Sequence, residues 1–125
     1  MAGENGNRVV AGVPDLFFAA KIGETARQIG VAIEFASSRQ ALLDKASRAP
    51  ALVILDLGAA ALDPIGLIAK LKADPALRST RVVGFVNHER TDLIEQARQA
   101  GCDEVLTRGA FTKGLPGILA EPGSR

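Results

Sequence analysis

Short apolar runs alternate along this chain with longer stretches whose apolar residues recur every three or four positions. The clearest run covers residues 51–57 and ends beside one carboxylate, Asp56. Apolar runs of this length suit a strand that is buried on both faces of a parallel sheet. Asp56 would then lie at the carboxyl edge of the sheet, where open α/β folds place their ligand crevice.

Further strands and helices are expected on both sides of this run. The expected strands cover 8–13, 31–35, 51–57, 81–86 and 104–107. The expected helices cover 15–29, 37–48, 63–77, 91–100 and 112–120, the last of them short and weak. In the first helix, one stripe of apolar residues is expected to face the sheet: Leu16, Ala19, Ile22, Ala26 and Ile29.

Polar residues and glycines mark the ends of these helices. Gly30 and Gly101 follow a helix end, where glycine adopts the left-handed cap conformation most easily. Ser37 and Gln40 have the spacing of a capping box. The other expected caps are Asp15, Asp63, Thr91 and Thr112.

Strands that alternate with helices predict right-handed crossovers and a doubly wound, five-stranded parallel sheet between two layers of helices. This is the flavodoxin-like α/β class. The length of 125 residues fits one domain. We expect that domain to cover 8–120, between a disordered tail over 1–7 and a frayed tail over 121–125.

Charge and composition argue against several classes of partner. Lys and Arg total 15 and Asp and Glu total 14, so no overall field favours nucleic acid or an anionic membrane. Trp and Tyr are absent, which leaves few side chains on which bases could stack. No apolar segment approaches the roughly 20 residues that span a bilayer, and the polar N-terminus is unlike a secretory signal. A cytoplasmic location is expected.

Two single residues have reactive side chains. Cys102 is the only cysteine, and we interpret it as a small buried apolar residue in preference to a reactive thiol. His88 is the only histidine and follows a strand in a predicted loop. Because no His/Cys cluster accompanies it, we interpret it as an ordinary loop residue and expect no metal site there.

An ordered set of short motifs resembles the receiver domains of two-component response regulators over residues 8 to about 120. The motifs are Pro14-Asp15-Leu16, Leu55-Asp56-Leu57, Asp63-Pro64-Ile65-Gly66, residues 72–77, residues 100–103 and Val105-Leu106-Thr107-Arg108. The resemblance implies that a histidine kinase could phosphorylate Asp56. It also implies a Mg²⁺ ion held by an acidic pair that ends the first strand, by that aspartate and by the backbone carbonyl of Gly58.

Carried over by position, most of the helper residues of a receiver differ in this chain. The acidic pair becomes Ala11 and Gly12, and the Ser/Thr that ends the fourth strand becomes Val86, with Asn87 next to it. The lysine that ends the fifth strand becomes Arg108, with Gly109 in place of the usual proline, and the switch aromatic becomes Val105.

These differences weaken the phosphoryl chemistry that the resemblance implies. One carboxylate holds Mg²⁺ weakly, and Asp15 is expected to cap its helix instead of replacing the lost pair. Arg108 could pair with Asp56 in a bidentate manner, an attraction of roughly 4 kcal/mol at about 4 Å before desolvation. Alternatively, Arg108 could point to solvent.

The leading hypothesis is therefore a degenerate receiver, a non-enzymatic signalling module without a cofactor that binds a histidine kinase or an effector. The resemblance places its contact surface, which could also form a homodimer, on the helix 91–100, the strand 104–107 and the last helix. A second hypothesis is a working phosphoacceptor that uses Asp56, Arg108 and a cation. A third, a nucleotide or small-ligand binder, has no glycine-rich phosphate loop to support it.

Overall fold

The computed structural model describes residues 8–122, which form one five-stranded parallel sheet in the order β2-β1-β3-β4-β5. The strands are β1 (Val9–Gly12), β2 (Ile33–Phe35), β3 (Leu52–Asp56), β4 (Arg81–Val86) and β5 (Glu104–Thr107). The α-helices are α2 (Leu16–Ile29), α3 (Arg39–Ala46), α4 (Pro64–Ala73), α5 (Thr91–Ala100) and α6 (Arg108–Ala120). Two short 3₁₀ helices, η1 (Ala60–Leu62) and η2 (Pro75–Leu77), flank α4.

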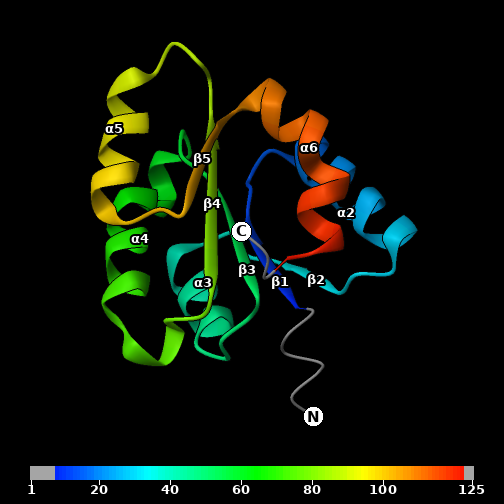
Figure 1. The fold of residues 1–125 in the computed structure, drawn as a ribbon, viewed down its shortest axis with the longest axis horizontal. Helices are drawn as coiled ribbons and strands as arrows, with labels where there is room; N and C mark the ends of the chain where they lie inside the picture. The colour runs from blue at the N-terminus through cyan, green and yellow to red at the C-terminus, as the bar shows by residue number, and fades with distance from the viewer. Residues whose placement is uncertain (1–7, 123–125) are drawn as a thin grey trace.

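The helices lie on both faces of the sheet, as the alternating pattern predicts (Figure 1). One apolar cluster joins α2 and α6 to the sheet through Val9, Ala11, Ile54 and Phe85. The other joins α3, α4 and α5 to the opposite face. The expected doubly wound, flavodoxin-like α/β fold is therefore confirmed.

The side chains of β3 alternate between these two clusters. Val53 and Leu55 pack toward α3, α4 and α5, whereas Leu52 and Ile54 pack toward α2 and α6. Because side chains alternate along a strand, Asp56 points to the α2–α6 side at the carboxyl end of β3. The sheet thus brings Asp56 to the edge where α2 and α6 begin.

The predicted apolar stripe of α2 is partly wrong. Ile22 and Ala26 are fully buried, but Leu16 is 82% exposed and Ile29 is 38% exposed. At about 100° per residue, Leu16 lies well away from the direction shared by Ile22 and Ala26. Phe18 lies closer to that direction and packs against the core in its place.

Two predicted caps are corrected by the structure. Ser38, and not Ser37, caps α3, because its Oγ accepts a hydrogen bond from the Ala41 amide at 3.1 Å. Gln40 donates to Asp44 along the same helix instead of reaching back to the cap. Thr91 is the first residue of α5, and no side chain caps that helix.

The last helix is longer than predicted, because it begins at Arg108 and not at Thr112. Thr107 caps it by accepting a hydrogen bond from the Ala110 amide at 3.2 Å. Three buried side chains four residues apart then anchor α6 to the sheet despite an internal proline: Phe111, Leu115 and Leu119. The N-terminus of α6 therefore lies directly at the end of β5.

Other predicted ends are confirmed. Asp15 caps α2, Asp63 caps α4, and Gly30 and Gly101 end α2 and α5 with left-handed backbone conformations. The tail predicted over 1–7 and residues 123–125 lie outside the described residues. Between residues 8 and 122, no helix is both long enough and apolar enough to cross a membrane.

Candidate functional site at the carboxyl edge of the sheet

Asp56 is the one buried carboxylate at the carboxyl edge within residues 8–122. The residue is 7% exposed, and its Oδ1 accepts a hydrogen bond from the Gly58 amide at 2.9 Å. Burial has the largest effect on this group and raises the pKa of Asp56 above its ordinary value, while the Gly58 amide and Arg108 oppose that rise. Asp56 therefore ionises at a cost that its neighbours offset only in part.

Arg108 supplies the positive charge that faces Asp56. One terminal nitrogen of its guanidinium lies 3.8 Å from Asp56 Oδ2, which is an ion pair but is too long for a hydrogen bond. The Arg108 side chain is 43% exposed. The geometry thus lies between the two alternatives left open by the sequence: Arg108 pairs with Asp56 without the bidentate contact and still reaches solvent.

Aromatic rings support the Arg108 guanidinium, a feature that sequence reasoning missed. The Arg108 Cζ lies 4.8 Å from the ring centre of Phe18 and 5.3 Å from that of Phe85, within the range of a cation–π contact. Phe85 stacks on Phe111 with ring centres 4.6 Å apart. The sequence signal was weak: all five phenylalanines lie within elements that begin or end at this edge, and nothing in their spacing singles out Phe18 and Phe85.

The two positions that would carry the acidic pair of a receiver are filled with apolar groups. Ala11 is fully buried between the sheet and the α2–α6 layer. A Cβ atom added to Gly12 would lie 2.6 Å from Leu42 Cδ1, 3.1 Å from Leu55 Cδ2 and 3.2 Å from Leu62 Cδ1. The residues present therefore do not fit the Mg²⁺ site that the fold family implies, since Mg²⁺ requires several oxygen ligands.

Asp15 lies close enough to Asp56 for its negative charge to help raise the pKa of Asp56, but its side chain serves as a helix cap. Its Oδ1 accepts hydrogen bonds from the amides of Phe17 at 2.9 Å and Phe18 at 3.2 Å, as expected of a helix cap. Within residues 8–122, no group of three or more His, Cys, Asp or Glu side chains is arranged to hold a metal ion.

The positions that would transmit a phosphorylation signal are apolar or already engaged. Val86 is buried at the end of β4, and Val105 is half-buried against the same apolar cluster. Asn87 is exposed, and its Oδ1 accepts a hydrogen bond from the Glu89 amide at 3.0 Å. Asn87 therefore forms a local turn, as loop asparagines commonly do.

The exposed His88 and the end of β5 border a small hollow at this edge. The hollow measures about 360 Å³ and is lined by Asn87, His88, Thr107, Arg108 and Gly109. Gly109 would tolerate a side chain without a close contact, so no functional reason for glycine is visible there.

Cys102 lies away from this edge, at the start of β5. Its Sγ lies 3.2 Å from the carbonyl oxygen of Glu104 and 3.5 Å from that of Val82, either of which can accept its one proton. Burial raises the pKa of the Cys102 thiol to about 11, which suppresses the thiolate at neutral pH.

Comparison with known proteins locates the fold among response-regulator receivers. No protein-family model matches the sequence, and no curated protein matches it either. The structure of a response regulator from Hahella chejuensis is similar, with a TM-score of 0.79 and 19% identity over 91% of this chain and 92% of that one.

Two further solved structures agree with this result. The receiver domain of a response regulator from Rhodospirillum rubrum has a TM-score of 0.72 and 23% identity, covering 90% and 91% of the two chains. The receiver domain of the putative response regulator NarL from Mycobacterium tuberculosis has a TM-score of 0.77 and 19% identity, covering 93% and 94%. At this level of identity, the comparison establishes that the chain has the fold of a response-regulator receiver domain.

Proposed function

We propose that this protein is a degenerate receiver, a non-enzymatic signalling module that acts by binding other proteins and is not switched by Mg²⁺-dependent phosphorylation. The observation that carries the proposal is that Ala11 and Gly12 supply no side-chain oxygen, and that leucine side chains pack where a Cβ atom at Gly12 would lie. The receiver fold supports the coarser part of the proposal, a role in two-component signalling.

Loss of the acidic pair matters because phosphoryl transfer depends on neutralising charge. A receiver-type reaction places negative phosphoryl oxygens beside a carboxylate, and catalysis comes mainly from cations and donors that are already in position. Here the one cation facing Asp56 within residues 8–122 is Arg108, 3.8 Å away. A second positive charge on a metal would need oxygen ligands that Ala11 and Gly12 do not supply.

Arg108 gives the edge a permanent cation instead. A guanidinium stays charged at any physiological pH, and the rings of Phe18 and Phe85 hold it beside Asp56. Since the Arg108 side chain is 43% exposed, solvent screens the pair, and we expect it to contribute little to stability. Its proposed role is to keep the charge at this edge constant.

The proposal is tested by incubating the protein with acetyl phosphate and Mg²⁺ and measuring its intact mass. We expect no added phosphoryl group, and the same result for Asp56→Asn. An active receiver domain treated in parallel shows that the reagent works. A stoichiometric gain that is absent from Asp56→Asn would overturn the proposal.

One observation favours the alternative, a working phosphoacceptor phosphorylated by a histidine kinase. Asp56 Oδ2 lies 3.8 Å from Arg108, beyond hydrogen-bonding distance, so the pair does not lock this oxygen in place. Under this alternative, Mg²⁺ would bind weakly beside Asp56 and Arg108 would contact the phosphoryl group. Mg²⁺ binding that disappears in Asp56→Asn would support it.

A further inference from the structure

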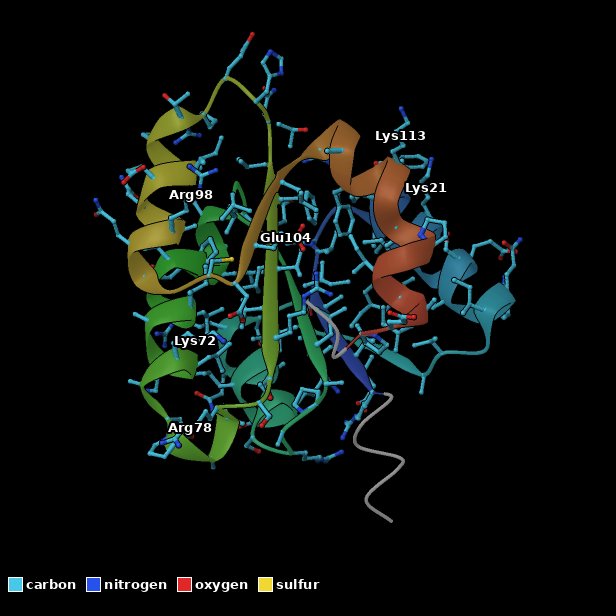
Figure 2. The ribbon with its side chains drawn as sticks, in the orientation of Figure 1. Lys21, Lys72, Arg78, Arg98, Glu104 and Lys113 are labelled. Carbon is cyan, nitrogen blue, oxygen red and sulfur yellow. The ribbon has the colours of Figure 1, made fainter. Side chains whose placement is uncertain are left out.

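The large apolar side chains that are exposed within residues 8–122 all lie on α2 and β2. Leu16 is 82% exposed, Phe17 is 91% exposed, and Ile29 and Phe35 are each 38% exposed. Single exposed apolar residues are ordinary, but apolar side chains that share one hollow can mark an interaction surface, and Leu16 and Phe35 line the same groove. Charged side chains occur beside this group as well as elsewhere: Lys21 lies on α2, Lys72 on α4, Arg98 on α5 and Glu104 on β5 (Figure 2).

An open groove runs along this part of α2. Its volume is about 570 Å³. The helix residues that line it are Leu16, Ala19, Ala20, Gly23, Glu24 and Arg27, with Phe35 of β2 beside them. Within this set, Leu16, Ala20, Gly23 and Arg27 are spaced by four, three and four positions, so they form one stripe along α2. We call this stripe and Phe35 the α2 groove.

The shape of the α2 groove is complementary to itself. Leu16 is large and protrudes at the N-terminal end, whereas Ala20 and Gly23 are small and form the middle. If a second α2 lies antiparallel, with a two-fold axis between Ala20 and Gly23, the small residues of both helices come together, flanked by the Phe35 ring that packs beside Gly23. An interface formed by one surface on both copies requires this kind of self-complementarity.

The charges along α2 favour the same antiparallel arrangement. Asp15 caps the exposed N-terminal end, and Arg27 lies in the last turn with its side chain 75% exposed. Antiparallel pairing brings Arg27 of one copy to the Asp15 end of the second copy, twice in each dimer. It also opposes the two helix dipoles, whereas parallel pairing would place like ends together.

Arg27 is available for this contact. It pairs with Glu24 one turn earlier on the same helix, but both side chains are more than half exposed. An exposed pair of this kind contributes little, so Arg27 can exchange Glu24 for Asp15 of the second copy at small cost.

From these features we infer that the α2 groove binds the α2 groove of a second copy of this chain, forming an antiparallel homodimer. The inference rests on the proposed function, because it names a partner for the protein binding proposed there. We expect one helix pair with its flanking Phe35 to bury less than the roughly 800 Å² per partner of a stable complex. We therefore expect a reversible monomer–dimer equilibrium.

Sedimentation velocity from micromolar to millimolar protein tests this inference. Ala20→Glu places two carboxylates in the middle of the helix pair, on an exposed position that accepts a good helix former, so it should shift the equilibrium to monomer at least tenfold. Ala69→Glu is the matched control, because Ala69 is exposed within α4 on another part of the molecule. Circular dichroism shows that both variants keep the fold.

An oxidative cross-linking experiment provides a second readout. Ala20→Cys should form a disulfide-linked dimer faster than Ala69→Cys, and the native Cys102 stays a spectator because its thiol is largely protonated. A monomer at every concentration would overturn the inference and leave the α2 groove to another protein. A dimer that Ala20→Glu does not weaken would overturn it as well. Neither result depends on whether Asp56 accepts a phosphoryl group, so the two proposals fail separately.

Discussion

Gly12 allows the apolar packing at the edge of the sheet to be tested directly. Substituting alanine adds one Cβ atom, which the backbone geometry places 2.6 Å from Leu42 Cδ1. Leu42, Leu55 and Leu62 are each at most 1% exposed. These leucine side chains therefore have little free space into which to move. The added atom therefore has to displace packed side chains.

The expected cost follows from the energetics of overpacked cores. Forcing an extra carbon into a well-packed site costs about 1–3 kcal/mol. Gly12→Asp adds a buried carboxyl group without a hydrogen-bonding partner, a further cost of about 1–3 kcal/mol. We predict that stability falls from the wild type to Gly12→Ala and again to Gly12→Asp. We also predict that Gly12→Asp does not gain Mg²⁺ binding.

Urea unfolding monitored by circular dichroism measures these differences, and Gly117→Ala is the matched control. Gly117 lies inside α6 with no atom within 4 Å of an added Cβ and no positive φ. Replacing it should stabilise the protein by up to about 1 kcal/mol, because alanine is the better helix former. The free energy of unfolding should therefore fall in Gly12→Ala and rise in Gly117→Ala.

A Gly12→Ala protein as stable as the wild type would contradict this reasoning. So would a Gly12→Asp protein that keeps its stability and binds Mg²⁺, because the carboxylate would then have room at the edge of the sheet. Either outcome would remove the main physical argument for a degenerate site.

Three other predictions concern titratable groups. Because burial raises the pKa of Asp56 above 3.8, the folded state binds the Asp56 proton more tightly than the unfolded state does. Stability therefore falls as the pH rises from 3.8 through the pKa that Asp56 has in the folded protein. Asp56→Asn should therefore be more stable than the wild type at pH near 7 but not below 3.8, as urea unfolding across pH would show; a less stable variant at neutral pH would contradict this. Arg108→Met should raise the pKa of Asp56 further, and Arg108→Lys should raise it less. The carbon-13 chemical shift of the Asp56 carboxyl group measures this pKa, and an unchanged pKa in Arg108→Met would show that Arg108 does not act on Asp56. Cys102, with its pKa raised to about 11, should react slowly with iodoacetamide in the folded protein and rapidly in denaturant; rapid labelling of the folded protein would contradict its burial.

The sheet was predictable because the strands repeat strong local signals. The run over 51–57 and the glycines that end α2 and α5 depend on near neighbours in sequence, and the structure follows them closely. Caps were less predictable, since Ser37 and Ser38 both satisfy the local pattern and only the packing of α3 selects Ser38.

The contacts of the candidate site were predictable only in part. Sequence placed Asp56 and Arg108 at the same edge, because Asp56 ends one strand of a parallel sheet and Arg108 directly follows another. It did not reveal that Phe18 and Phe85 support Arg108, since those rings come from elements far apart in the chain. It also assigned Leu16 to the core, because periodicity alone does not show how far around the helix the buried face extends.

The most direct test of the central claim is whether a divalent cation occupies the edge beside Asp56. Mn²⁺ added in small amounts to nitrogen-15-labelled protein broadens the amide signals near any site that it occupies. We predict that the Gly58 amide broadens no more in the wild type than in Asp56→Asn. Strong, saturable broadening at Gly58 that Mg²⁺ reverses and Asp56→Asn abolishes would contradict the account.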